Sequence, residues 1–400
     1  MIMLPAQFLP VAIRTAVVGV CLLDIWNSWK VARADYLFRQ DTAESIRSAI
    51  SLAPDASEYY VRLAQLDDVH GRDLLETALR LNQYNAQASI ELGLRYEADG
   101  DYPRAEKLLL QAFAVDHTYL PRWSLVNFYL RRDNMPAFWT WARSAAEMPA
   151  DDVGALFELC WRVSPDPQKI AGILLEDNPA LIRQYLNFLL GKNQPLAAAD
   201  TAPRLIRTGT PEADRTLLFS VVNRLVSAND GTAANTLWHE LIQRHWIVAD
   251  TTVPNNAAFA RDPQPVSFDW TLSSITGLNS WPGPSGLETE FTGNEPENSS
   301  IAEQTVVLAS GNYRMKYSYR TTDIPPDTGI QWQIVDAKSG AVLATSPSLS
   351  NPAITSATLP FSVPPGAPLL RLRLIYQRAL GTPRISGTLM VRSIQIETST

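Results

Sequence analysis

The stretch from Ala86 to Tyr119 constrains the fold of this chain more than any other. It contains two series of apolar and small side chains, each with the three- to four-residue spacing of a helix face. The polar sequence Asp99-Gly100-Asp101 separates them; Gly100 suits the positive φ of a turn and Asp101 suits a helix N-cap. We therefore predict a helical hairpin. One hairpin leaves an apolar face uncovered, so further hairpins must pack beside it.

The pattern resembles the tetratricopeptide repeat (TPR), a hairpin of two helices that stacks into solenoids. The matching residues are Leu92, Gly93, Tyr96 and Ala105. The departures are Ser89 for the usual Trp, Leu109 for Phe and His117 for Pro. The spacing has a physical reason, because small residues such as Gly93 and Ala105 are needed where two helices cross closely.

Weaker copies of this pattern flank the repeat. Residues 35–56 end near Pro54, where the closing proline of a repeat belongs, and residues 57–85 form a shortened copy. A degenerate copy begins at Leu120, and six further helical segments, separated by Pro or Gly, follow between residues 150 and 250. We predict a TPR-like α-solenoid over residues 35–250.

Residues 1–34 are predicted to be a membrane anchor. Thr15–Ile25 is almost wholly apolar, and Phe8–Trp29 is long enough to cross a bilayer if its charged side chains reach the interface. Two tryptophans and two basic residues follow, as at a membrane interface: Trp26, Trp29, Lys30 and Arg33. The alternatives are a first solenoid helix that is buried and a cleaved signal peptide. The flanking charges do not fix the orientation.

Beyond residue 250 the hydrophobic period changes from 3.6 to 2 residues, and proline becomes frequent. We predict a linker over residues 251–266 and an antiparallel β-sandwich over residues 267–400, which makes the chain an α+β multidomain protein. The sandwich resembles carbohydrate-binding-type jelly rolls (galactose-binding-like domains). The resemblance rests on the opening Phe268-Asp-Trp270, the turn Ser310–Tyr313 and the closing strand that begins at Gly387.

A polar face of this sandwich is the candidate binding site. Polar residues alternate with apolar ones on three predicted strands, and Trp281 lies in a Pro/Gly loop. Basic and amide side chains beside an aromatic plane suit sugar hydroxyls or a protein partner. The candidates are Trp281, Arg314, Lys316, Gln331, Gln333, Arg371 and Arg373. The alternative is an ordinary solvated outer face.

We predict no catalytic residue, no cofactor and no metal. His239 and His245 are six residues apart and lie on different helix faces, so they cannot share a zinc ion. Four acidic residues around one turn suggest either a structural calcium ion or, more simply, a solvated loop: Glu288, Glu290, Glu295 and Glu297. The formal charge of −7 argues against nucleic acid as a partner. The two cysteines do not decide the compartment.

The predicted function is that of a non-enzymatic scaffold. The solenoid would bind a protein partner, the sandwich a glycan or a second protein, and residues 1–34 a membrane, with both domains outside the cytoplasm, in the periplasm. Such a pairing resembles accessory factors of bacterial envelope or exopolysaccharide assembly, a likeness of architecture and not of chemistry. The first alternative is a purely structural docking subunit of a protein complex. The second is a glycan-active enzyme with a carboxylate pair, which the sequence favours less because the acidic residues of the sandwich lie mostly in predicted turns.

Overall fold

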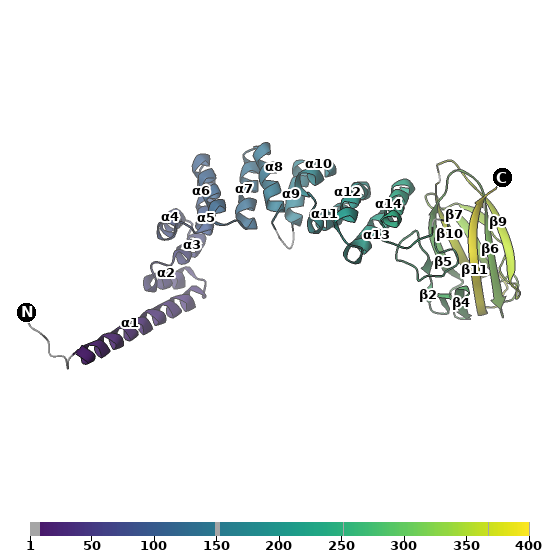
Figure 1. Cartoon of the computed structure of the whole chain (residues 1–400), viewed down its shortest axis with the longest axis horizontal. Helices are drawn as coiled ribbons and strands as arrows, with labels where there is room; N and C mark the ends of the chain where they lie inside the picture. Colours follow the sequence, from purple (N-terminus) through teal and green to yellow (C-terminus); the bar gives the residue numbers. More distant parts are fainter. Residues whose placement is uncertain (1–8, 149–152, 251, 367, 400) are drawn as a thin grey trace, which may run out of the picture. The chain divides into compact units, whose positions relative to one another are not determined.

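A computed structural model describes residues 9–148, 153–250, 252–366 and 368–399, with the backbone alone for residues 9–16. The chain divides into two compact units, Met1–Asp151 and Asp152–Thr400. Within the described residues, fourteen helices are followed by eleven strands (Figure 1). The predicted α+β fold class is therefore confirmed.

The first unit consists of helices that pack in sequence order, each against the next. They are α1 (Leu9–Phe38), α2 (Ala43–Leu52), α3 (Ser57–Leu66), α4 (Gly71–Leu81), α5 (Ala86–Ala98), α6 (Tyr102–Val115), α7 (Tyr119–Arg131) and α8 (Met135–Ala146). The α5–α6 hairpin has the predicted turn, because Gly100 has a φ of +82° and Asp101 caps α6 by accepting a bond from Arg104 N. A Cβ atom on Gly93 would lie 3.3 Å from Ala105 O, so the two helices cross closely there, as the spacing predicts.

Helix α1 has two different halves. Ala34 is fully buried, in a cluster that includes Ile46 and Tyr59. Residues 17–31, in contrast, expose large apolar side chains, each more than half accessible: Val17, Val18, Val20, Leu22, Leu23, Ile25, Trp26, Trp29 and Val31. The first half of the predicted anchor, up to residue 16, lies outside the residues whose side chains are described. Across the described part of the chain, no helix is both long and apolar enough to cross a membrane, so the predicted anchor is not supported there.

Two buried tyrosines of the first unit donate hydrogen bonds to carboxylates. Tyr59 donates to Asp35 Oδ1 at 2.6 Å, and Tyr129 donates to Glu106 Oε1 at 2.6 Å. Burial first, and then the neighbouring carboxylate, raises the pKa of each phenol to about 12.

We expect these tyrosines to make the first unit sensitive to alkali. A pKa that is higher in the folded than in the unfolded protein gives stability that is intact below about pH 10 and is lost as the pH rises toward 12. The loss should be about 2 kcal/mol for each tyrosine. Urea unfolding of the full chain between pH 8 and pH 12, followed by helical circular dichroism, measures it. The double variant Tyr59→Phe and Tyr129→Phe should be less stable at pH 8 and should have a shallower pH dependence; an unchanged slope would contradict this explanation.

The second unit begins with six more helices, paired as α9 with α10, α11 with α12 and α13 with α14. They are α9 (Gly154–Val163), α10 (Pro167–Leu174), α11 (Pro179–Gly191), α12 (Pro195–Thr208), α13 (Pro211–Ser227) and α14 (Gly231–Gln243). Five of them have proline in the first turn or a capping Asp or Asn side chain, which explains where they begin.

Two antiparallel sheets complete the second unit (Figure 1). The strands are β1 (Thr271–Leu272), β2 (Ser274–Ile275), β3 (Leu278–Gly283), β4 (Gly286–Thr292), β5 (Asn298–Val307), β6 (Gly311–Thr322), β7 (Ile330–Asp336), β8 (Val342–Thr345), β9 (Thr355–Val363), β10 (Leu369–Gln377) and β11 (Ser386–Thr398). One sheet has the order β1-β5-β10-β7-β8 and the other β2-β3-β4-β11-β6-β9. Their inner faces share a core in which Tyr317 of β6 contacts Trp332 of β7, with ring centroids 6.2 Å apart.

The segment before the sandwich, predicted as a linker over residues 251–266, packs against the sandwich in the structure. Phe259 belongs to the core, and Asn255 O accepts a bond from Gln304 Nε2 at 2.9 Å. On the other side, Asn223 of α13 accepts bonds from Ser267 N and Ser267 Oγ, both at 2.8 Å. The segment therefore joins the last helical hairpin to the sandwich through a hydrogen-bonded connection.

Candidate functional site

The seven predicted site residues lie on two different outer faces of the sandwich. Trp281 on β3 and Arg314 and Lys316 on β6 belong to the six-stranded sheet. The other four belong to the five-stranded sheet: Gln331 and Gln333 on β7, and Arg371 and Arg373 on β10. The two sheets pack core to core, so their outward side chains point away from each other. The expectation that these residues form a single face is therefore wrong.

On the five-stranded sheet the charged side chains are already paired. Arg373 Nε lies 3.1 Å from Glu303 Oε2, and Arg371 Nη2 donates to Ala337 O at 3.3 Å. Gln333 lies opposite Arg373 in the β7–β10 register. A ligand would have to displace these contacts, so this face has the properties of a solvated outer surface.

Lys316 on the six-stranded sheet is also paired. Its ammonium group lies 2.7 Å from Glu397 Oε2 on β11. Arg314 lies two residues before Lys316 on β6 and opposite Glu397 in the register. Its Nε is buried without a hydrogen-bond partner among the described residues. These two cations therefore belong to one end of the β6–β11 pair, away from Trp281.

Trp281 lies in a row of side chains that runs across four strands. The register places it opposite Glu288 on β4, Glu288 opposite Met390 on β11, and Met390 opposite Arg320 on β6. Together with Thr388, these four side chains line a depression of about 180 Å³ on the outer face of the sheet. We call Trp281, Glu288, Met390 and Arg320 the Trp281 row.

The polar members of the Trp281 row have no internal partner. Within the described residues, neither Glu288 nor Arg320 forms an ion pair or a side-chain hydrogen bond, whereas the neighbouring Lys316 does. The indole of Trp281 is 36% exposed. The Glu288 side chain lies over Gly283, where any Cβ atom would collide with its carboxylate, so this glycine leaves room for the acid. The row therefore offers one aromatic plane, one free carboxylate and one free guanidinium.

The dimensions and chemistry of the row suit an elongated polar ligand. Neighbouring strands lie about 4.8 Å apart, so the row from Trp281 to Arg320 extends over roughly 14 Å. An indole plane packs well against an apolar ring face, while a carboxylate accepts and a guanidinium donates hydrogen bonds. The sequence identified Trp281 but did not join Glu288 and Met390 to it. The only sign of Glu288 and Met390 in the sequence was that each occupies an outward position in a strand whose side chains alternate between core and surface. The order of the strands in the sheet is not visible in the sequence.

The four acidic residues considered for calcium do not gather around one point. Glu288 belongs to the Trp281 row, and Glu290 lies two residues further along β4, opposite Asn279. Glu295 is fully buried, with Oε1 accepting from Ile385 N at 3.2 Å, and Glu297 pairs with Arg378 at 2.8 Å. Among the side chains that the structure describes, no group of three His, Cys, Asp or Glu residues is arranged to hold a metal ion.

Comparisons with solved structures find matches at low sequence identity. The chain is similar to a CBM4 structure, at 10% identity over 36% of this chain and 99% of that one, with a TM-score of 0.30. It is also similar to YrrB, a TPR protein with an unusual peptide-binding site, at 13% identity over 51% of this chain and 93% of that one, with a TM-score of 0.24. A third match is yeast Tom70, at 16% identity over 57% of this chain and 53% of that one, with a TM-score of 0.34.

No protein-family model matches the sequence, and no curated protein matches it significantly. At these identities and TM-scores, the matches assign neither a family nor a ligand to this chain. The structure itself confirms the predicted order of paired helices followed by an antiparallel β-sandwich.

Proposed function

We propose that this chain is a non-enzymatic binding protein whose sandwich holds a glycan on the Trp281 row. The observation that carries the proposal is the depression in which Trp281, Glu288 and Arg320 meet with both charges unpaired. Unpaired charged side chains beside an exposed indole leave hydrogen-bonding capacity directed at an outside ligand. A sugar matches this surface because one ring has both an apolar face and a rim of hydroxyl groups.

Binding of the full chain to a glycan array tests this proposal. We expect selective retention of a class of oligosaccharides, confirmed by calorimetric titration of the best ligand. Absence of binding to every glycan, combined with recovery of a stable protein complex, would instead favour a docking subunit without a sugar ligand.

We further propose that the hairpins of the first unit bind a protein partner. A depression of about 470 Å³ lies between α5 and α7 and is lined by Leu94, Glu97, Ala98, Tyr102, Arg131 and Arg132. Arg131 is held by two bonds to Glu97, at 2.7 and 2.6 Å, and Arg132 lies over the Tyr102 ring at 3.4 Å. Exposed apolar side chains beside the Arg132 guanidinium, which forms no ion pair among the described residues, suit an extended acidic peptide.

Residues 1–34 are proposed to hold the chain at a lipid surface, on the periplasmic side of a bacterial envelope where exopolysaccharide is assembled. Support comes from the exposed apolar half of α1, which ends in stacked Trp26 and Trp29 with ring centroids 5.2 Å apart. Lys30 Nζ lies 5.8 Å from the Trp26 ring. Tryptophan followed by basic residues is typical of membrane interfaces.

Co-sedimentation with lipid vesicles tests this attachment. We expect the full chain to pellet with vesicles that contain anionic lipid, and the double variant Trp26→Gln and Trp29→Gln to lose about tenfold in partition. Both side chains are more than half exposed, so the variant should fold normally. As a control, Tyr84→Gln removes an aromatic side chain that is 68% exposed elsewhere in the unit and should pellet as the parent does. Equal pelleting of all three proteins would refute attachment through α1.

A further inference from the structure

The outer face of the five-stranded sheet buries a leucine that does not belong to the sandwich core. Leu370, Leu372 and Leu374 of β10 point into the core, so the alternation along the strand directs Leu369 to the outer face. Leu369 is nevertheless only 3% exposed. A part of the chain outside the sandwich core must therefore cover this end of the sheet.

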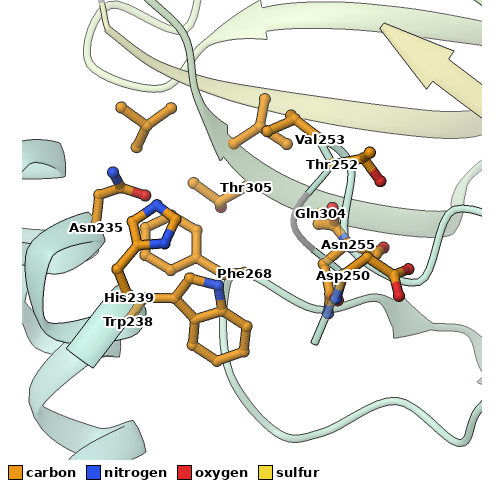
Figure 2. Close-up of a pocket in the computed structure, with 12 residues that line it drawn as sticks. Asn235, Trp238, His239, Asp250, Thr252, Val253, Asn255, Phe268, Gln304 and Thr305 are labelled. Atoms are coloured by element: carbon orange, nitrogen blue, oxygen red, sulfur yellow. Dashed lines mark hydrogen bonds between the residues drawn. The ribbon is translucent and has the colours of Figure 1, made fainter. Parts of the chain in front are cut away.

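Helix α14 provides the cover. A Cβ atom on Gly231, the first residue of α14, would lie 3.1 Å from Leu369 Cδ1 and 3.5 Å from Val307 Cγ2 of β5. Because residue 231 has no side chain, the helix can lie this close to the sheet. Asn235 and Trp238 share a helix face with Gly231, and Figure 2 shows both beside β5. One face of α14 therefore packs on the outer face of the five-stranded sheet.

The rest of this junction is also closely packed. Trp238 is buried, and its ring centroid lies 6.4 Å from that of Phe219 on α13 and 5.8 Å from that of Phe268, which precedes β1. Phe268 is buried as well. A cavity of only about 50 Å³ is left between α14, β5 and the segment from Asp250 to Asn255 (Figure 2). Apolar contacts therefore connect the helical hairpin to the sandwich.

Hydrogen bonds connect the same parts. Asn223 of α13 accepts bonds from Ser267 N and Oγ, and its Nδ2 donates to Pro265 O at 3.2 Å. Ser267 O in turn accepts a bond from Thr305 N of β5 at 2.8 Å. Ser267 thus bonds α13 on one side and a strand of the sandwich on the other. Domains that meet through a small polar interface move relative to each other, whereas a junction with apolar burial and direct bonds resists such motion.

We propose that the α13–α14 hairpin and the sandwich form one cooperative folding unit, in which α14 holds the sandwich at a fixed orientation. The Trp281 row lies on the outer face of the six-stranded sheet, whereas α14 covers part of the outer face of the five-stranded sheet. The row therefore faces away from the α13–α14 hairpin, and a long polymer can cross it without meeting this hairpin. The proposal concerns packing alone and holds whether or not the row binds a glycan.

Native-state hydrogen exchange of the full chain, measured at increasing urea concentrations below the unfolding transition, tests the cooperativity. We expect the slowest amides of α13, α14, β5 and β10 to share one opening free energy and one dependence on urea. Opening of the two helices at lower urea, while the strands keep their protection, would overturn the proposal. The experiment uses no ligand, so its failure is distinguishable from a failure to bind glycans.

The variant Gly231→Leu tests the contact between α14 and the sheet. A leucine at this position needs space that Leu369 occupies, so it should push the helix away from the sheet. We expect exchange of residues 264–270 and of the first residues of β10 to become about tenfold faster. The amides of β6 and β11 should stay slow, which verifies that the sandwich is folded.

Gly172→Leu on α10 is the matched control. A Cβ atom on Gly172 meets no atom within 4 Å, so this variant should leave exchange in residues 264–270 and in β10 unchanged. If exchange in Gly231→Leu is as slow as in Gly172→Leu, then α14 does not hold the sandwich and the proposal is wrong.

Discussion

Replacing Arg183 with alanine is expected to lower the free energy of unfolding of the second unit by about 3–5 kcal/mol. Asp214, on α13, is fully buried, and its carboxylate accepts bonds from the Arg183 guanidinium and, at 2.9 Å, from Thr210 N. Without Arg183, the carboxylate stays buried with one backbone donor and no countercharge. The cost is large because it is the desolvation of an unpaired ion, not the value of one surface contact. Urea unfolding of the full chain, monitored by tryptophan fluorescence, measures it.

Lys192→Ala is the matched control for this loss. Lys192 forms an ion pair of 2.7 Å with Glu158 in the same unit, but both side chains are about a third or more exposed. An exposed pair is screened by water, so its removal should cost less than about 1 kcal/mol. The double variant Arg183→Met and Asp214→Leu should recover most of the stability, because it leaves no buried charge. A loss in Arg183→Ala no larger than that in Lys192→Ala would contradict this account.

The hairpin of α5 and α6 was predictable because its determinants are local. Gly93 meets Ala105 across a turn of a few residues, and Gly100 and Asp101 define the turn itself. Each requirement can be read from residues less than twenty positions apart in the sequence. The same holds for the division into helices before residue 250 and strands after it, since each period is a short-range pattern.

The candidate site was only partly predictable because its geometry is non-local. Alternation along β6 and β7 shows which side chains leave the core, but it does not show that the two strands belong to different sheets. Met390 meets Glu288 only because β11 is inserted between β4 and β6. That order depends on strand pairings about a hundred residues apart, and no short pattern encodes it.

Composition did not show how the segment between residues 252 and 266 packs. Asn, Asp and Pro are typical of linkers, but the same side chains can replace backbone partners in a compact turn. Asn256 illustrates this, since its Nδ2 donates to Arg261 O at 2.8 Å while its Oδ1 accepts from Arg261 N at 3.2 Å. Whether such a segment is free or folded depends on what it packs against, which here is the sandwich core through Phe259.

Replacing Trp281 with alanine is expected to weaken glycan binding by about 30-fold while leaving the sandwich folded. Central tryptophans in binding sites commonly contribute about 2 kcal/mol or more, which corresponds to that factor. The indole lies on the outer face of β3 and is 36% exposed, so its loss opens no cavity in the core. Trp281→Phe should retain much of the affinity because a smaller aromatic plane remains. Calorimetric titration with the best ligand from the array gives the affinities, and circular dichroism verifies the fold.

Variants on the two outer faces decide which sheet carries the site. Arg320→Ala should weaken binding by about tenfold, since it removes a free guanidinium from the end of the Trp281 row. Gln333→Ala, on the outer face of the five-stranded sheet, should bind as the parent does. The opposite result, with Gln333→Ala impaired and Trp281→Ala unaffected, would move the glycan site to the five-stranded sheet. There a neutral glycan would compete with the Arg373–Glu303 ion pair, which salt screens, so binding should strengthen as the salt concentration rises. On the Trp281 row no ion pair has to be displaced, so the salt dependence of binding a neutral glycan should be shallow.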